Sequence, residues 1–170
     1  MLIGSFKIGQ LELRNLKPGE DNLNNYLNWM KNEKNNFIES VHPSWNLQEL
    51  SNFVEKCNSS DSCVLLGIFE GATHIGNIKI DQIDSGSKSA WIGILIGSFA
   101  HRGIGIGNAV ISQVTKKFYE NLQIENFFLG VDKQNIVAIK SYKKSGFSYF
   151  RDHEKLDAII MHKKEGRLLA

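Results

Sequence analysis

The sequence predicts an α+β fold, with a mixed central β-sheet flanked by helices on both faces. Two observations predict it. Three apolar segments of strand length, 63–70, 73–83 and 88–97, follow one another with short polar turns between them, which indicates an antiparallel meander. The last segment runs into a glycine-rich turn and then into a stretch with helical periodicity. We expect one domain over residues 1–170, because no repeat, low-complexity tract or Pro/Gly-rich linker divides the chain.

The elements expected before the meander are a strand and two helices. Residues 11–16 alternate between apolar and polar side chains and predict the strand. Pro18 suits the first turn of a helix over 19–32, and Asn46 suits the N-cap of a second helix, with Glu49 completing a capping-box pattern. The apolar positions recur at helical spacing: Leu23, Tyr26, Leu27 and Met30 in the first helix, and Leu47, Leu50, Phe53 and Val54 in the second.

The remaining elements complete the order β-α-α-β-β-β-α-β-α-β-β. The third meander strand is apolar at every position from 90 to 97, so we expect a central strand that is covered on both faces. A long helix follows the glycine turn. Then come a strand at 126–132, a helix after Asn135, and two closing strands at 147–154 and 157–164. The stripe expected to be buried on the long helix is Val110, Ile111, Val114, Phe118 and Leu122.

The turn Arg102-Gly103-Ile104-Gly105-Ile106-Gly107 places three glycines on alternate residues at the start of a helix. Glycine tolerates backbone angles that aim successive N–H groups at one point, and a helix N-terminus attracts anions, so the turn predicts a phosphate site. A tight loop that uses glycine for clearance is the structural alternative. A Walker loop does not fit, because Asn108-Ala109 follows the last glycine. A dinucleotide fingerprint needs G-x-G-x-x-G near the start of its fold, and that pattern is not met here.

Composition argues against several classes of function. The net charge of +2 and the lack of a basic run give no nucleic-acid or membrane surface. No apolar stretch approaches the ~20 residues of a membrane span, and the N-terminus lacks the apolar core of a signal peptide, so we expect a cytoplasmic protein. Cys57 and Cys63 have no partner at metal-ligand spacing, so we expect two free thiols and no metal site.

The order of elements and the R-x-x-G-x-G turn resemble motif A of the GNAT superfamily of acetyl-CoA-dependent N-acetyltransferases. The segment from Asn135 through Ala138 and Tyr142 to Gly146-Phe147 resembles motif B of that family. The likeness spans about residues 9–162, and the wider pattern is similar to the branch of ribosomal-protein, spermidine and amino-sugar acetyltransferases. The resemblance implies a GNAT-like fold, acetyl-CoA as cofactor, and transfer of the acetyl group to a primary amine by direct attack on the thioester.

The resemblance also implies roles for residues that match the two motifs. Ile94, Leu95 and Ile96 would pair with the pantetheine arm through main-chain hydrogen bonds, one of which polarises the acetyl carbonyl. The pyrophosphate cradle would be Arg102, Gly103, Ile104, Gly105, Ile106 and Gly107. Asn135 would hydrogen-bond the cofactor arm, and the small Ala138 would leave room for it. Tyr142 would lie near the sulfur as general acid, with a packing role as the alternative.

The general base stays unassigned. Many relatives have an acidic residue where Trp91 stands, and in some of them it helps to activate the amine. The titratable alternatives are His42, His74, His101, His153, Glu39, Asp81 and Glu154. His74 is expected in a hairpin turn and His101 beside the glycines, both exposed. The favoured interpretation is removal of the proton through water, with no side chain named.

The acceptor pocket implied by the resemblance is formed by residues 37–45, the meander and the last hairpin. The expected acceptor-site residues are His42, Trp45, Asn77, Lys79 and Trp91. Aromatic faces with an amide favour a small amine such as an amino sugar or sugar nucleotide, because a polyamine would need clustered carboxylates. The alternatives are a protein N-terminal or lysine acetyltransferase and a non-catalytic acyl-CoA-binding domain. A dimer is common in the resembled branch, so a homodimer is compatible with the resemblance.

Overall fold

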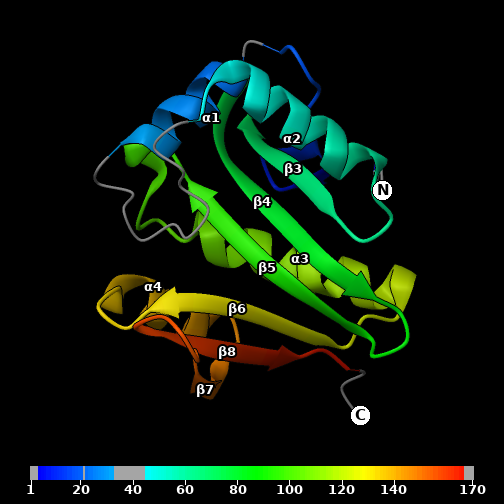
Figure 1. The fold of residues 1–170 in the computed structure, drawn as a ribbon, viewed down its shortest axis with the longest axis vertical. Coiled ribbons are helices and arrows are strands. Elements are labelled where there is room, and N and C mark those ends of the chain that lie inside the picture. The colour runs from blue at the N-terminus through cyan, green and yellow to red at the C-terminus, as the bar shows by residue number, and fades with distance from the viewer. Residues whose placement is uncertain (1–3, 21, 33–44, 167–170) are drawn as a thin grey trace. The chain divides into compact units, whose positions relative to one another are not determined.

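The computed structural model describes residues 4–20, 22–32 and 45–166 (Figure 1). The hydrogen-bonded strand order is β1-β2-β3-β4-β5-β6-β8-β7, an eight-stranded mixed sheet. The predicted α+β class is confirmed, and the element order matches the expectation apart from the added β1 and η2, a short 3₁₀ turn. In chain order the elements are β1 (Phe6–Ile8), β2 (Leu11–Asn15), α1 (Asn22–Lys31), α2 (Leu47–Ser59), β3 (Val64–Glu70), β4 (Thr73–Asp84), β5 (Ser89–Ile96), η2 (Phe99–His101), α3 (Ile106–Leu122), β6 (Asn126–Asp132), α4 (Ile136–Lys144), β7 (Ser148–Asp152) and β8 (Ala158–Lys164).

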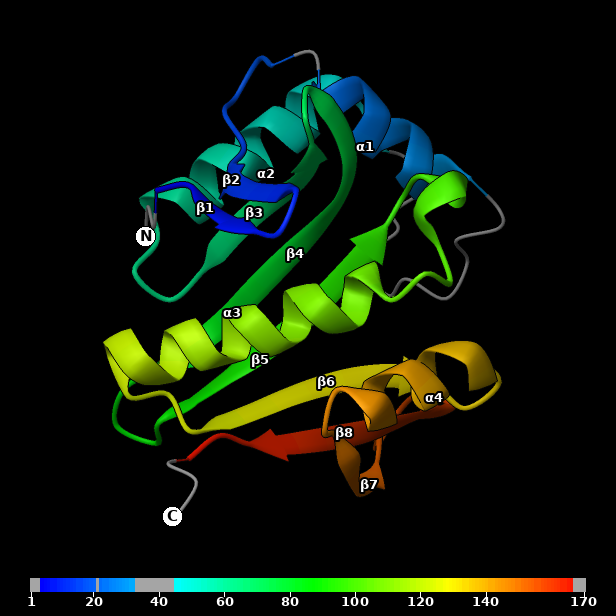
Figure 2. The same ribbon diagram turned by 180° about the vertical axis from the view of Figure 1, so that it is seen from behind.

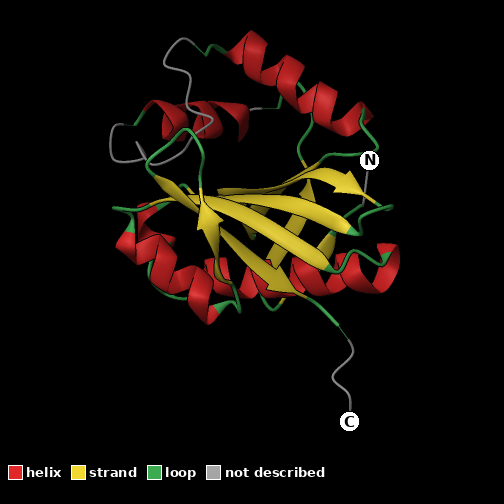
Figure 3. Cartoon of the chain, turned by 60° about the horizontal axis from the view of Figure 1, so that its bottom comes forward, coloured by secondary structure: helices red, strands yellow, loops and turns green. Residues whose placement is uncertain are grey.

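The chain forms two compact units. The first contains residues 1–79 and 94–102, and the second contains residues 80–93 and 103–170, so β4 and β5 each run from one unit into the other. The first unit holds α1, α2 and the strands β1 to β3, which Figure 2 shows from behind. The second unit holds α3, α4 and the strands β6 to β8, and Figure 3 distinguishes helices from strands by colour.

In the first unit, short antiparallel strands are joined to a pair of helices. β1 pairs with β2, with Phe6 opposite Leu13, and β2 pairs with β3, with Leu13 opposite Ile68. α1 packs against α2, and α2 packs against β3. The buried residues of this core are Leu16, Leu23, Leu27, Met30, Leu50, Val54, Cys57, Cys63, Leu65 and Phe69.

Local sequence determines where both helices begin. The Asn46 side chain accepts a hydrogen bond from the Glu49 N–H at 3.0 Å, and the Glu49 carboxylate accepts one from the Asn46 N–H at 2.9 Å. The predicted capping box is therefore confirmed. α1 begins later than expected, at Asn22, because Gly19 adopts a φ of +77° that no α-helix contains. Pro18 consequently lies in a turn before the helix and not in its first turn.

In the second unit, β6 pairs antiparallel with β8 along its whole length, and β8 pairs with β7. β5 pairs with β6 in parallel over only three positions, and this ladder ends at Trp91 opposite Phe128. β6 continues to Asp132 without a β5 partner beyond that point. The edge of β6 after Phe128 therefore keeps main-chain groups that are not used in pairing with β5.

The long helix α3 is buried as predicted on one stripe, although Leu122 is half-exposed. It is also tied to β8 by a polar network. The ammonium of Lys163 donates to the Thr115 hydroxyl at 2.8 Å and pairs with the Glu165 carboxylate at 2.6 Å. Because Thr115 is fully buried, these partners satisfy a hydroxyl that would otherwise destabilise the core.

The strand β5 is less buried than the sequence suggested. Ala90 and Ile92 are buried, but Ile94, Leu95 and Ile96 are half-exposed. The expectation of a strand covered on both faces is therefore wrong for its last three residues. The ladder to β6 ends at Trp91 and does not reach these three residues.

The two cysteines are not joined by a disulfide, as expected, and both are buried, with their sulfur atoms 3.2 Å apart at the junction of α2 and β3. Among the described residues, no group of three or more His, Cys, Asp or Glu side chains is placed to hold a metal ion. Within the same residues, no helix combines the length and hydropathy needed to cross a lipid bilayer.

Candidate functional site

The end of β5 is fixed by a close packing contact and by a bulge. Trp29 lies so near Gly97 that a Cβ at this position would be 1.9 Å from the indole ring, so only glycine fits. The N–H groups of Gly97 and Ser98 both donate to the Ile75 carbonyl, at 2.9 and 3.1 Å. Two residues opposite one is the arrangement of a β-bulge, which bends the strand. The chain therefore leaves the sheet directly after the half-exposed residues Ile94–Ile96.

Arg102 holds the main chain at the end of this segment. Its Nε atom donates to the Ile96 carbonyl at 2.7 Å, and its guanidinium lies 4.1 Å from the centroid of the Phe99 ring. Burial lowers the pKa of Arg102, but an arginine in a protein keeps its charge. The sequence assigned Arg102 to the pyrophosphate cradle. The structure adds a contact with β5 that fixes where this cation lies.

The glycine turn takes its shape from two left-handed residues. Gly103 has a φ of +76°, and Gly105, the N-cap of α3, has a φ of +90°. A Cβ at either position would meet no atom within 4 Å. Glycine is therefore needed here for its backbone conformation and not for clearance from the rest of the protein. This result favours the phosphate interpretation of the turn over the tight-loop alternative.

The start of α3 has open hydrogen-bond donors. The six main-chain N–H groups from Gly103 to Asn108 have no acceptor among the described residues. The first hydrogen bond of the helix runs from the Ala109 N–H to the Gly105 carbonyl at 3.0 Å. Gly105 has no side chain that could cap the helix, and the first turn contains no acidic residue. Consecutive free amides at the positive end of a 17-residue helix dipole are suited to binding an anion.

Asn135 and Ala138 lie in the first turn of α4. Asn135 is the N-cap, and its side-chain oxygen accepts a hydrogen bond from the Ala138 N–H at 3.1 Å. That oxygen is therefore used by the helix. The amide nitrogen of Asn135 has no acceptor in the described part of the chain, so a ligand contact by this residue would come from Nδ2.

Tyr142 lies on α4 with its ring centroid 6.3 Å from that of Phe147. Burial raises the pKa of Tyr142 to about 12. Its hydroxyl has no hydrogen-bond partner among the described side chains and main-chain groups. The phenol therefore keeps its proton at neutral pH and is available to donate it.

A contact that the sequence did not predict joins α3 to α4. The Ser141 hydroxyl donates to the side-chain oxygen of Asn108, which is in the first turn of α3. The two residues are 33 positions apart, so no local pattern indicates that they meet. The helix that carries Tyr142 is therefore bonded to the turn that carries the open amides.

The predicted acceptor residues are placed in different surroundings. His42 lies outside the described residues. Trp45 packs edge-on against Phe53, with centroids 5.3 Å apart, at the border of the α1–α2 core. Lys79 lies 5.8 Å from the same Phe53 ring. In the second unit, Trp91 lies beside Phe128, at 5.6 Å. Trp45 thus has a packing role that the sequence did not reveal.

Asn77 and His74 form a buried polar pair in β4. The side-chain oxygen of Asn77 is 2.8 Å from His74 Nε2, and His74 Nδ1 is 3.2 Å from the Asn22 carbonyl. The amide nitrogen of Asn77 is buried with no partner in the described residues. The prediction that His74 is exposed in a turn is wrong, because β4 already begins at Thr73 and the ring is 3% exposed. Burial lowers the pKa of His74.

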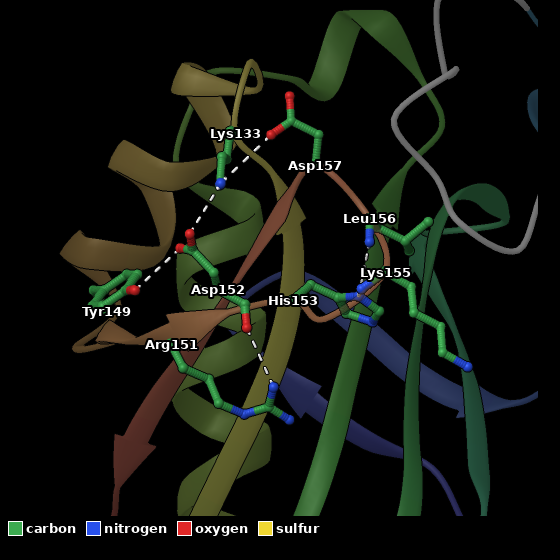
Figure 4. A network of polar contacts seen from close by, with 8 residues as sticks. All are labelled: Lys133, Tyr149, Arg151, Asp152, His153, Lys155, Leu156 and Asp157. Carbon is green, nitrogen blue, oxygen red and sulfur yellow. Dashed lines mark hydrogen bonds and ion pairs between the residues drawn. The ribbon is translucent and has the colours of Figure 1, made fainter.

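Among the described residues, the other candidate bases have polar partners. His153 Nδ1 accepts hydrogen bonds from the N–H groups of Lys155 and Leu156, both at 3.2 Å (Figure 4). This ring nitrogen is therefore engaged by the main chain of the last hairpin. Glu154 pairs with Arg151 at 3.5 Å.

His101 and Asp81 are also engaged. His101 is half-exposed, not exposed as expected, with Nδ1 2.6 Å from the Ser98 hydroxyl and Nε2 3.2 Å from Glu70. Asp81 accepts a hydrogen bond from the Gln82 N–H at 2.8 Å. Glu39 lies outside the described residues. Proton removal through water stays a prediction.

Comparison with known proteins agrees with the arrangement of these elements. A sequence profile described as an acetyltransferase (GNAT) domain matches residues 16–163. No curated protein sequence matches the chain significantly.

Several solved structures share the fold. A ribosomal L7/L12 alpha-N-protein acetyltransferase, RimL, in complex with coenzyme A has a TM-score of 0.80 at 15% identity, over 94% of this chain and 97% of that one. The spermidine N-acetyltransferase of Vibrio cholerae, in complex with CoA and spermine, has a TM-score of 0.76 at 22% identity. The match covers 95% of this chain and 99% of that one. The Campylobacter jejuni N-acetyltransferase PseH has a TM-score of 0.69 at 18% identity, and the match covers 92% of this chain and 99% of that one.

At these identities the structural likeness concerns the fold, while the profile covers most of the chain, including the glycine turn and the helix of Tyr142. The chain therefore belongs to the GNAT family of acetyltransferases.

Proposed function

We propose that this protein is an acetyl-CoA-dependent N-acetyltransferase that acts on the primary amine of a small molecule. The observation that carries the proposal is the run of six amides from Gly103 to Asn108, at the start of α3, for which the described part of the chain provides no acceptor. These donors suit the pyrophosphate of the coenzyme, the cosubstrate that several structural neighbours were crystallised with. With no carboxylate in the first turn, no acidic side chain of the helix competes with the phosphates.

The pantetheine arm is proposed to lie along residues Ile94–Ile96. Their side chains are half-exposed and apolar, and the strand is about to leave the sheet through the bulge at Gly97. An extended ligand can add to such a strand through main-chain hydrogen bonds. One N–H group of this segment is then in place to donate to the acetyl oxygen as charge develops on it.

Tyr142 is proposed as the general acid. Acetyl-CoA supplies an activated acetyl group in the form of a thioester. The amine must be neutral to attack it, and the departing sulfur must gain a proton. Tyr142 holds its proton at neutral pH because burial raises its pKa to about 12, and its hydroxyl has no partner among the described residues. A positioned acid of this kind typically contributes about 10²–10⁴-fold to the rate.

The acceptor is proposed to be a small amine, with an amino sugar or sugar nucleotide favoured. Trp91 offers an aromatic face and Asn77 an amide with an unused donor. Trp45 supports this less than the sequence suggested, because its ring packs against Phe53. The second candidate is acetylation of a protein N-terminus, since the fold is shared with an alpha-N-protein acetyltransferase.

The experiment has a binding stage and a turnover stage. Acetyl-CoA at about 100 times its Kd should stabilise the protein by roughly 2.7 kcal/mol, which for a chain of this length raises the Tm by about 5–11 °C. Purified protein with acetyl-CoA is then given a polyamine, an amino sugar, a nucleotide-linked amino sugar and a peptide with a free N-terminus. Mass spectrometry identifies any product that is heavier by one acetyl group.

The outcomes separate the hypotheses. Acetylation of the amino sugars supports the favoured acceptor, and acetylation of the peptide alone supports the second candidate. Tyr142→Phe should reduce turnover, while Tyr149→Phe, on the exposed strand β7, should not. Binding of acetyl-CoA without any product would instead indicate a non-catalytic acyl-CoA-binding domain. Absence of binding would refute the proposal as a whole.

A further inference from the structure

The contact between Ser141 and Asn108 has no role in the proposed chemistry. It nevertheless connects the helix start with the open amides to the helix that carries Tyr142. Asn108 is the third residue of α3, and its own N–H is one of the six open amides. Ser141 directly precedes Tyr142 on α4. The Ser141 hydroxyl donates to the Asn108 side-chain oxygen, and both residues are half-buried.

The start of α2 provides a comparison for Asn108. There, the third residue of the helix bonds a main-chain amide at the helix N-terminus. Glu49 is the third residue of α2, and its carboxylate reaches back to the N–H of the N-cap Asn46 at 2.9 Å. That helix satisfies its first amides with its own side chains. A ligand at its N-terminus would have to displace them.

Asn108 has the chemistry to do the same for α3. Asparagine oxygens readily bond main-chain N–H groups close by in the chain, and this habit makes the residue common at helix starts. Gly105 has no side chain and the first turn has no acid, so Asn108 is the residue in that turn whose side chain carries an oxygen. Its hydrogen bond from Ser141 occupies that oxygen and turns it toward α4.

We propose that Ser141 is a positioning residue that keeps the Asn108 oxygen away from the first-turn amides of α3, so that these donors stay open for the diphosphate of the coenzyme. The inference rests on the proposed function, because it assumes that a diphosphate binds there. The inference and an ordinary structural contact predict opposite effects when the second residue of the pair is also substituted. Removal of the Ser141 hydroxyl frees a competitor for the amides, and removal of the Asn108 oxygen as well eliminates that competitor.

The test compares Ser141→Ala, Asn108→Ala and the double variant by isothermal titration with coenzyme A, together with the Tm of each. Ser141→Ala should raise the Kd about three- to tenfold, the range that one net hydrogen bond corresponds to. Asn108→Ala and the double variant should bind within about twofold of the wild-type protein. Ser145→Ala is the matched control. Ser145 lies just after the same helix, and its side chain bonds the Ser141 carbonyl at 3.3 Å and no other group among the described residues.

The contrary results are distinct. If the double variant binds as weakly as Ser141→Ala, the hydroxyl acts only as a link between helices and the inference is wrong. Wild-type affinity in Ser141→Ala would overturn it equally. If Ser141→Ala does not fold, Asn108→Ala still decides between the two explanations. A purely structural link predicts that Asn108→Ala binds coenzyme A more weakly, whereas the inference predicts no loss of affinity. Failure of the wild-type protein to bind coenzyme A would instead refute the proposed function.

Discussion

Replacement of Gly105 by alanine separates the role of the glycine turn in folding from its role in binding. Gly105 has a φ of +90° with no atom within 4 Å of a Cβ position. Alanine there meets no neighbour and suffers only the cost of a left-handed backbone, roughly 1–2 kcal/mol. For a chain of this length that lowers the Tm by about 2–8 °C. We expect the turn to relieve part of this cost by adjusting its dihedral angles, which re-orients the neighbouring amides. Loss of one hydrogen bond to a charged phosphate, about 1.5–3 kcal/mol, then weakens coenzyme binding about 10–150-fold.

Gly71 provides the matched control. It lies in the turn between β3 and β4, has a φ of +58°, and also has no atom within 4 Å of a Cβ position. Gly71→Ala should therefore lose a similar amount of stability and keep its affinity for coenzyme A, measured by titration calorimetry. If Gly105→Ala also keeps full affinity at a lowered Tm, the amides do not grip the diphosphate. If both variants lose affinity alike, the effect is general destabilisation.

Three further substitutions test other parts of the argument. Tyr142→Phe should lower kcat by about 10²–10⁴-fold and change the Kd for acetyl-CoA by less than about threefold, as steady-state kinetics and calorimetry can show. Gly97→Ala places a Cβ 1.9 Å from the Trp29 ring and should cost about 1–3 kcal/mol or more in denaturant unfolding, whereas Gly93→Ala meets no atom within 4 Å and should cost little. Burial lowers the pKa of His74, so its contribution to stability is complete above about pH 6.5 and is lost as the pH falls through its folded pKa. His74→Gln should therefore flatten the dependence of Tm on pH between 7.5 and 5. If the variant keeps the same slope as the wild-type protein, the lowered pKa of His74 is not the source of that dependence.

The features that the sequence predicted well are those determined by neighbouring residues. The capping box of Asn46 and Glu49 needs only four consecutive positions, and it forms as expected. The glycine turn is similar, because the left-handed angles at Gly103 and Gly105 reflect a local preference of one residue type. In both cases the local preference and the tertiary structure agree.

The features that the sequence did not predict depend on contacts between distant residues. His74 follows a glycine turn and looked exposed, but it stacks on Phe69 and lies 4.8 Å from the Trp29 ring. The apolar run of β5 indicated burial on both sides, but its final residues are half-exposed and lie beyond the end of the ladder to β6. Asn108 and Ser141 are unremarkable in their own segments. Only the packing of α3 against α4 brings them together.

If Tyr142 is the general acid, as proposed, its high pKa determines where the proton for the sulfur originates. A thiol has a pKa near 8.5, so a phenol with a pKa of about 12 gives up its proton to a free thiolate at a cost of roughly 5 kcal/mol. Tyr142 must therefore regain a proton as it gives one, and the attacking amine nitrogen is the group that has protons to lose. Because no side chain is assigned as the base, we expect deprotonation of the amine before attack to be left to solvent. The value of kcat/KM should then rise with pH up to the pKa of the acceptor amine itself, near 10.4 for an alkylamine and about 7.7–8.0 for an α-amine. Two acceptors with different amine pKa values should give pH profiles displaced by that difference. Identical profiles for both would show that a base of the enzyme controls the reaction.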